Sequence, residues 1–116
     1  MVLVTTWEKV ELETLSDTIT RQMVNGNQTT LARICLSKGA LVPRHAHASE
    51  QVSFILSGAL KFIFDTHEEI VKEGAFIVIP SNVPHAAEAL EDTEDLDVFA
   101  PRREDWIRKD DAYLRR

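Results

Sequence analysis

The chain has 116 residues, of which 44% are hydrophobic and 28% are charged, and its formal net charge is −6 at pH 7. This length and hydrophobic content predict one compact domain spanning residues 1–116. The negative charge argues against nucleic acids and acidic membranes as general partners, so a small anionic ligand would need a local positive centre.

The N-terminal stretch "MVLVTTWEKVE" lacks a positively charged start and a long apolar core. No apolar run approaches the roughly 18 residues that a membrane span needs. The single cysteine, Cys35, excludes an internal disulfide, which fits a reducing compartment. We therefore expect a cytoplasmic protein, and we expect Cys35 to be a buried thiol.

Turn-forming stretches recur along the chain, at 25–27, 37–39, 57–58, 65–69, 72–74 and 80–84. Short runs rich in β-branched and aromatic residues lie between them, such as 51–56, 60–64 and 75–79. These runs have the length of strands and are too short for typical helices. The pattern predicts an all-β sandwich or barrel.

Helix is expected only at the ends of the chain. Residues 103–116, "REDWIRKDDAYLRR", are predicted to form a short helix or an extended arm lying on the barrel. The preceding stretch 88–97 contains six acidic residues and no basic one. This composition favours a solvated hairpin with its turn near residues 91–95.

Two histidines, His45 and His47, lie two positions apart in a predicted strand. Successive side chains of a strand point to opposite faces, so the two imidazoles share a face and can bind one metal ion. If this alternation continues, Gln51 lies on the histidine face and Glu50 on the opposite one.

A third histidine, His85, follows a predicted strand and a turn that contains two prolines. Ala87 and Ala89 share its face, and their small side chains leave room near the imidazole. Three histidines in this arrangement favour a metal site, although histidines that are merely packed or exposed remain the alternative.

The spacing of these residues resembles two motifs of the cupin superfamily. From Gly39 to Gly58 the chain has glycine, five residues, His-x-His, three residues, Gln51, six residues and glycine. The second motif is approximated from Gly74 to Ala89, with Asn82 where the family prefers glycine and Ala89 where it has asparagine. Asparagine tolerates the positive φ that this turn requires. The resemblance implies an all-β, single-domain cupin jelly-roll barrel.

By the same resemblance the metal ligands are His45, His47, His85 and Gln51, in the position where most cupins have glutamate. Imidazole together with a hard oxygen suits a divalent Zn, Ni, Fe or Mn ion. A neutral amide oxygen leaves the ion its full charge, which favours an anionic ligand and Lewis-acid chemistry. Isomerisation, hydration or ring opening of an acid is therefore favoured over dioxygen chemistry.

A second candidate group lies near the C-terminus. Asp97 and Phe99 share one face of a predicted strand. An acid that enters an apolar barrel beside a phenylalanine is unusual unless it is paired or catalytic. The alternative is that Asp97 lies at a solvated strand end and bonds Arg102 or Arg103.

Over nearly its whole length the chain resembles small cupins of the pectin-degradation type, through Gln51, the stretches 19–27 and 31–47, and this C-terminal group. Those enzymes convert 4,5-unsaturated monouronates into linear keto sugars. The resemblance implies that Arg103 pairs with the uronate carboxylate, that Asp97 moves a proton, and that Phe99 forms an apolar wall.

Two other functions stay open. The chain can be another metal-dependent cupin that acts on a small acid, as an isomerase or a dioxygenase. It can also be a ligand-binding or regulatory cupin without catalysis, although no DNA-reading segment accompanies the barrel.

The remaining residues have simpler expected roles. We expect His67 at the surface, Arg21 as an exposed strand residue, and Trp7 and Trp106 as packing anchors. On the face of its strand opposite Gln51, the residues Val52, Phe54 and Leu56 are all apolar. The next predicted strand repeats this pattern with Leu60, Phe62 and Phe64. Because both faces of this sheet call for burial, a twofold homodimer is predicted.

Overall fold

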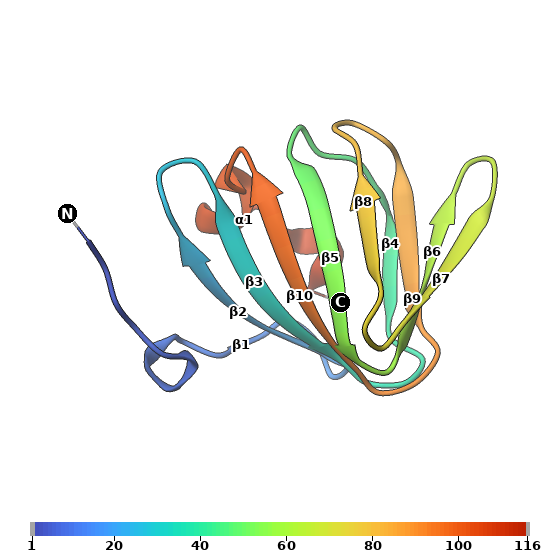
Figure 1. The fold of residues 1–116 in the computed structure, drawn as a ribbon, viewed down its shortest axis with the longest axis horizontal. Coiled ribbons are helices and arrows are strands. Elements are labelled where there is room, and N and C mark those ends of the chain that lie inside the picture. The colour runs from blue at the N-terminus through green and yellow to red at the C-terminus, as the bar shows by residue number, and fades with distance from the viewer. Residues whose placement is uncertain (1, 116) are drawn as a thin grey trace.

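Two antiparallel sheets face each other in the computed structural model, which describes residues 2–115 (Figure 1). In spatial order, the six-stranded sheet contains β1 (Glu13–Thr14), β2 (Ile19–Asn25), β3 (Thr30–Leu36), β10 (Thr93–Ala100), β5 (Glu50–Ser57) and β8 (Phe76–Ile79). The four-stranded sheet contains β4 (Leu41–His45), β9 (His85–Ala89), β6 (Ala59–Phe64) and β7 (Glu68–Lys72). This arrangement confirms the predicted cupin jelly roll.

In the described part of the chain, helical structure is limited to three short elements, η1 (Trp7–Lys9), α1 (Glu104–Ile107) and η2 (Ala112–Leu114). The predicted short C-terminal helix is confirmed by α1. Within residues 2–115, no helix has the length and apolar character needed to cross a membrane.

The core lies between the sheets because strands such as β5, β6 and β10 alternate buried and more exposed positions. On β5, Gln51, Ser53 and Ile55 are buried, and on β6, Leu60 and Phe62 are buried. Full burial of one large apolar side chain stabilises the fold by roughly 1.5–3 kcal/mol. Leu60 and Phe62 of β6 fill the interior, whereas Val52, Phe54 and Leu56 lie on the outer face of β5.

Two turns require unusual backbone angles. Gly58, between β5 and β6, has a φ of +89°, and a Cβ there would lie 2.3 Å from the carbonyl oxygen of Asp92. Any other residue would therefore clash as well as strain the backbone. Asn82 has a φ of 64°, as the sequence predicted for this position.

The acidic stretch 88–97 does not form the predicted solvated hairpin. Its two strands belong to different sheets, and residues 90–92 pass from β9 in one sheet to β10 in the other. Asp95 and Asp97 are buried because β10 lies in the middle of the six-stranded sheet and turns these positions inward. The prediction of a solvated hairpin was wrong because it relied on the acidic composition of the stretch and not on the alternation of its side chains.

Two other expectations are corrected by the same alternation. Cys35 is exposed, because its neighbours Ile34 and Leu36 point inward from β3. Arg21 is fully buried on the inner face of β2 rather than exposed. Its Nε donates to Glu13 at 2.9 Å and its Nη2 to Asp111 at 2.8 Å, so its charge is compensated.

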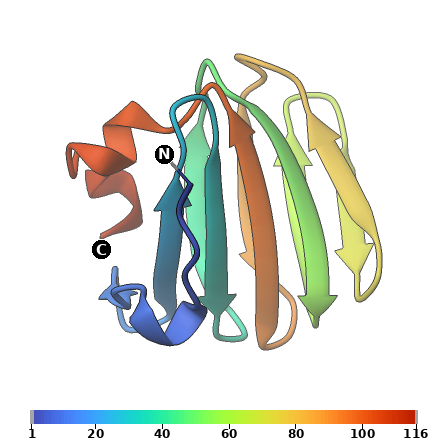
Figure 2. The same ribbon diagram turned by 60° about the vertical axis from the view of Figure 1, so that its left-hand side comes forward.

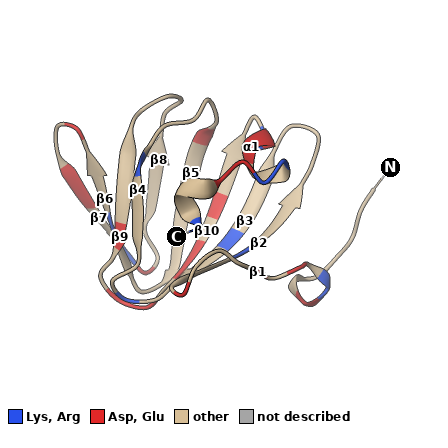
Figure 3. Cartoon of the chain, turned by 180° about the vertical axis from the view of Figure 1, so that it is seen from behind, with Lys and Arg blue, Asp and Glu red and all other residues tan. Residues whose placement is uncertain are grey.

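The C-terminal segment, residues 102–115, lies beside β1 and β2 at one edge of the six-stranded sheet (Figure 2). Seen from behind, it lies across the space between β2 and β4, with acidic and basic residues next to each other around α1 (Figure 3). Asp111 pairs with both Arg21 and Arg115, and Lys109 pairs with Glu13. We call these five residues the tail network, because they attach the segment to β1 and β2.

Candidate metal centre

Three histidines converge where β4 and β9 pair. His45 ends β4 and lies opposite His85, the first residue of β9, while His47 follows in the loop before β5. One ring nitrogen from each histidine lies within 4.8 Å of the others. The predicted convergence is confirmed, and these imidazoles can hold a metal ion.

Each histidine is oriented by a backbone carbonyl two residues away. The Nδ1 atoms of His45, His47 and His85 lie 2.8, 2.8 and 2.9 Å from the oxygens of Pro43, Ser49 and Val83. A protonated Nδ1 donates to each carbonyl and leaves the lone pair of Nε2 free for a metal.

Burial keeps the imidazoles neutral. It lowers the pKa of His45 to about 4, and it also lowers the pKa values of His47 and His85. Neutral imidazole is the form that ligates metal ions, so the three side chains are ready to bind near pH 7.

Gln51 faces this cluster from β5. It is buried whereas Glu50 is exposed, which confirms the predicted alternation. Its Oε1 lies 3.1 Å from His47 Nε2, and its amide nitrogen donates to Ser53 Oγ at 2.9 Å. When His47 Nδ1 carries the proton, His47 Nε2 and Gln51 Oε1 are both acceptors and cannot hydrogen-bond each other. A cation bound between them would accept both lone pairs. The residues present therefore fit a metal ion.

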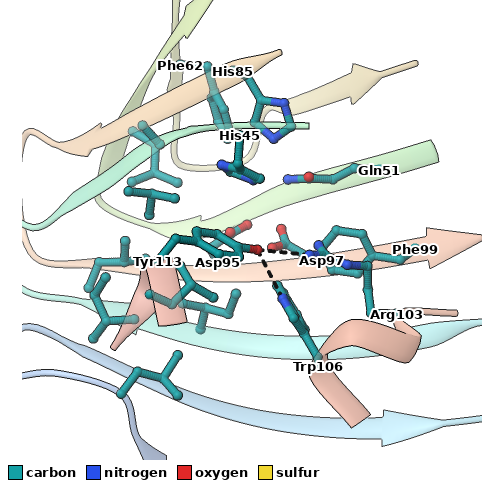
Figure 4. A pocket seen from close by; sticks show the side chains of 18 residues that line it. His45, Gln51, Phe62, His85, Asp95, Asp97, Phe99, Arg103, Trp106 and Tyr113 are labelled. Atoms are coloured by element: carbon teal, nitrogen blue, oxygen red, sulfur yellow. Dashed lines mark hydrogen bonds between the residues drawn. The ribbon is translucent and has the colours of Figure 1, made fainter. Parts of the chain in front are cut away.

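A cavity of about 60 Å³ lies between the histidines and the C-terminal segment. Figure 4 shows His45, Gln51 and His85 on one side of it, with Asp97 and Arg103 on the other. Phe99 also lines the cavity, and its ring meets the His47 ring edge-on at 5.6 Å between centroids. His45, His85 and Gln51 thus border one space with Asp97, Phe99 and Arg103, whereas His47 does not line it.

Arg103 is 2% exposed and is held by the C-terminal segment. Its Nε and Nη2 donate to the carboxylate of Asp105 at 2.9 and 2.8 Å, and Nη2 also donates to Tyr113 Oη at 2.9 Å. The guanidinium lies 4.1 Å from the ring centroid of Trp106 and 4.8 Å from that of Phe99. These contacts orient the positive charge along the cavity wall.

Asp97 does not pair with Arg102 or Arg103, so the alternative considered for it is wrong. It lies in the middle of β10, between Ala32 of β3 and Ser53 of β5. The Ser53 hydroxyl donates to its Oδ1 at 2.6 Å. Hydrogen bonds therefore link Gln51, Ser53 and Asp97 in one chain that runs from the metal cluster to the acid.

Two cavity residues were missed in the sequence. Tyr113 stacks on His45 with 4.8 Å between ring centroids, and its hydroxyl accepts from Arg103 and from Trp106. Asp95 lines the cavity next to Asp97. The strand alternation that turns Asp97 inward also turns Asp95 inward, whereas no local pattern places Tyr113 there.

The other expectations are mostly confirmed. His67 is exposed and lies 3.1 Å from Glu69. Trp106 is 3% exposed and packs edge-on against Phe99, but it also lines the cavity. Trp7 is half-buried, and the Arg33 guanidinium lies 5.9 Å from its ring centroid.

Comparison with known proteins identifies the fold family. No curated protein sequence matches the chain. Among solved structures, an RmlC-like cupin from Shewanella frigidimarina aligns with a TM-score of 0.81 and 28% identity, covering 88% of this chain and 93% of that one. KdgF from Halomonas sp. aligns with a TM-score of 0.78 and 24% identity, covering 85% of this chain and 94% of that one.

A variant of Bacillus subtilis oxalate decarboxylase aligns at 0.76 and 21% identity, covering 84% of this chain and 29% of that one. At 21% and 24% identity, the decarboxylase and KdgF show likeness of fold alone. The family model for the cupin domain matches residues 32–100, more than half of the chain. With its two motifs, its jelly roll and its histidine cluster in place, the chain belongs to the cupin family.

Proposed function

We propose that this cupin is a metal-dependent enzyme that opens the ring of a 4,5-unsaturated monouronate and yields a linear keto sugar. One observation carries the proposal: Gln51, Asp97, Phe99 and Arg103 border the same cavity as His45 and His85 of the histidine cluster. These are the residues for which the sequence resembles small cupins of the pectin-degradation type. The fold likeness to KdgF is compatible with this proposal but supports only the architecture.

The proposed ligand set is His45, His47, His85 and Gln51, all neutral donors. A divalent ion held there supplies a Lewis acid with its charge uncancelled, which favours a carboxylate-bearing substrate in a protein whose net charge is −6. Zn, Ni, Fe and Mn all suit this donor set.

Arg103 is proposed to bind the uronate carboxylate. Asp105 and Tyr113 engage its Nε and Nη2, and within residues 2–115 no acceptor is found for Nη1. The substrate carboxylate therefore approaches Nη1, on a guanidinium that its other contacts already orient. Phe99 covers the sugar ring with an apolar surface.

Asp97 is proposed to move the proton. It accepts the proton of the anomeric hydroxyl, the bond between the anomeric carbon and the ring oxygen breaks, and the electron pair passes to that oxygen as an enolate. Asp97 then returns the proton to C4, the other carbon of the double bond, and the enolate at C5 becomes a ketone. The product is an isomer of the substrate, so no other reactant is consumed.

Substrate entry is proposed to require the end of the C-terminal segment, with Tyr113 and Leu114, to move outward. Small-molecule sites typically enclose about 300–1,000 Å³, whereas this cavity measures about 60 Å³. Tyr113 and Leu114 supply part of its wall, so displacing them enlarges the space without disturbing the sheets.

The test is loss of the conjugated ultraviolet absorbance when the metal-loaded protein is mixed with unsaturated galacturonate or with its alginate-derived counterpart. Asp97→Asn should retain metal and substrate binding and lower turnover by about 10²-fold or more, because the amide cannot accept the proton. Glu94→Gln, on the outer face of the same strand, is the matched control and should stay active. If the wild-type protein accelerates loss of neither sugar, the proposal fails, and oxygen uptake by the iron-loaded protein becomes the next assay.

A further inference from the structure

Strand β10 places a second carboxyl group, that of Asp95, beside Asp97 on the inner face. Asp95 is 4% exposed and Asp97 is 3% exposed. Their closest strand neighbours are Ile34 and Ile55 for Asp95, and Ala32 and Ser53 for Asp97. Both acids line the cavity, so two carboxyl groups share one apolar space (Figure 4).

Neither acid forms an ion pair within residues 2–115. The nearby guanidinium groups are already engaged, Arg103 by Asp105 and Arg21 by Glu13 and Asp111. Two adjacent carboxylates without a cation are strongly disfavoured in an apolar site, because desolvation and mutual repulsion both act against the second charge. The pair therefore carries one proton and one negative charge.

The contacts indicate which acid carries the proton. Asp97 Oδ1 accepts from the Ser53 hydroxyl at 2.6 Å, which favours its charged form. Asp95 Oδ1 has no hydrogen-bond partner among the described residues, so nothing stabilises a charge on that oxygen. The geometry thus assigns the charge to Asp97 and the proton to Asp95.

The direction of the pKa shifts agrees with this assignment. Burial, followed by the charge of Asp97 and a hydrogen bond to it, raises the pKa of Asp95 well above its usual range. Burial also raises the pKa of Asp97, but hydrogen bonds from Asp95 and Ser53 and the charge of Arg103 oppose this rise. The elements packed around the pair present Arg21 from β2, His45 from β4, His85 from β9, and Arg103 and Tyr113 from the C-terminal segment.

We propose that Asp95 is a protonated positioning residue, whose carboxyl donates a hydrogen bond to Asp97 and keeps Asp97 ionised as the base. This inference rests on the proposed function, because it assigns Asp95 a role in the same proton transfer. Asp95 stays neutral throughout the reaction. Asp97 becomes neutral when it takes the proton from the substrate, and it becomes charged again when it returns that proton. The chemistry requires only that Asp95 can donate, so an amide is an adequate substitute.

Infrared spectroscopy without substrate tests where the proton resides. The wild-type protein at pH 7 should show the carbonyl stretch of a protonated carboxyl group, and Asp95→Asn should abolish it. Glu13 and Asp111, the other buried acids among the described residues, are both paired with Arg21, so the band has no other expected source there. Absence of this band in the wild-type protein would overturn the inference while leaving the proposed function intact.

Kinetics test the positioning role with two variants. Asp95→Asn should keep kcat/KM within about threefold of wild type and leave its pH profile unchanged. Asp95→Leu, which cannot donate, should lower kcat/KM at pH 7 by about 10²-fold and move the ascending limb of the profile to higher pH. If both variants lose activity equally with unshifted profiles, Asp95 is merely structural. If the wild-type protein shows the band but opens neither sugar, the proposed function fails, and the catalytic role of Asp95 fails with it.

Discussion

Gln51 occupies its position in one orientation because its two amide atoms meet different partners. The nitrogen donates to Ser53, and the oxygen faces His47. Ser53 in turn donates its only proton to Asp97. A glutamate at this position would therefore change the charge of the metal centre and would also compete with Asp97 for the Ser53 hydroxyl.

We predict that Gln51→Glu retains the metal but weakens binding of an anionic sugar. The carboxylate cancels one positive charge, so affinity should fall by about tenfold, which corresponds to about 1.4 kcal/mol. Calorimetric titration with a saturated uronate measures this affinity, and elemental analysis measures the metal. Glu50→Gln, on the exposed neighbour, is the control and should bind as the wild type does. Unchanged affinity in Gln51→Glu would contradict the charge argument.

At the scale of strands, alternation predicted the metal site well. It placed His45, His47 and Gln51 on one side and Glu50 on the other, and the structure agrees, although β4 ends at His45 and His47 lies in the loop rather than on the predicted strand. It worked because the segment between β4 and β5 is short and both ends border the same cavity. Motif spacing then added His85, which pairs with His45 across the sheet.

Prediction failed where long-range contacts decide burial. Arg21 lies on the inner face of β2, and its charge can stay buried because Glu13 and Asp111 surround it, although Asp111 is 90 positions away in the chain. Tyr113 reaches His45 only because the tail network holds the C-terminal segment against β1 and β2. No local pattern encodes such contacts, since they depend on how separate elements dock.

The tail network is expected to contribute measurably to stability. Glu13→Gln removes one partner of a buried ion pair and should lower the free energy of unfolding at pH 7 by about 3 kcal/mol. Glu11→Gln, on an exposed neighbour, should leave it nearly unchanged. Urea denaturation measures both, and equal stabilities of the two variants would contradict the proposed attachment.

The contribution of Glu13 should also depend on pH. Burial acts to raise its pKa, but hydrogen bonds and charges from Arg21 and Lys109 prevail and lower the pKa from 4.5 to about 2. A lowered pKa in the folded state stabilises the protein fully above pH 4.5, and this stabilisation is lost as the pH falls towards 2. The stability difference between wild type and Glu13→Gln should therefore shrink below pH 4.5, whereas a constant difference would contradict the ion-pair explanation.

At the scale of the whole molecule, an apolar surface is exposed. The outer face of the six-stranded sheet is apolar across several strands, through Leu31, Val52, Phe54, Leu56, Phe76, Val78, Leu96 and Val98. Phe76 is 65% exposed and Val98 is 41% exposed. Monomers rarely expose large continuous apolar patches. Because each chain carries a net charge of −6, this apolar patch is where two copies can meet with least repulsion.

We therefore propose a twofold homodimer formed through this face. Light scattering after size exclusion should give twice the chain mass for the wild-type protein. Phe76→Glu combined with Val98→Glu should give the monomer, because two copies would then oppose like charges across the twofold axis. Leu41→Glu is the matched control, since Leu41 is also 65% exposed but belongs to β4 in the other sheet, and it should remain dimeric. A wild-type protein that is monomeric at every concentration, or a Leu41→Glu variant that dissociates as readily as the double variant, would exclude this interface.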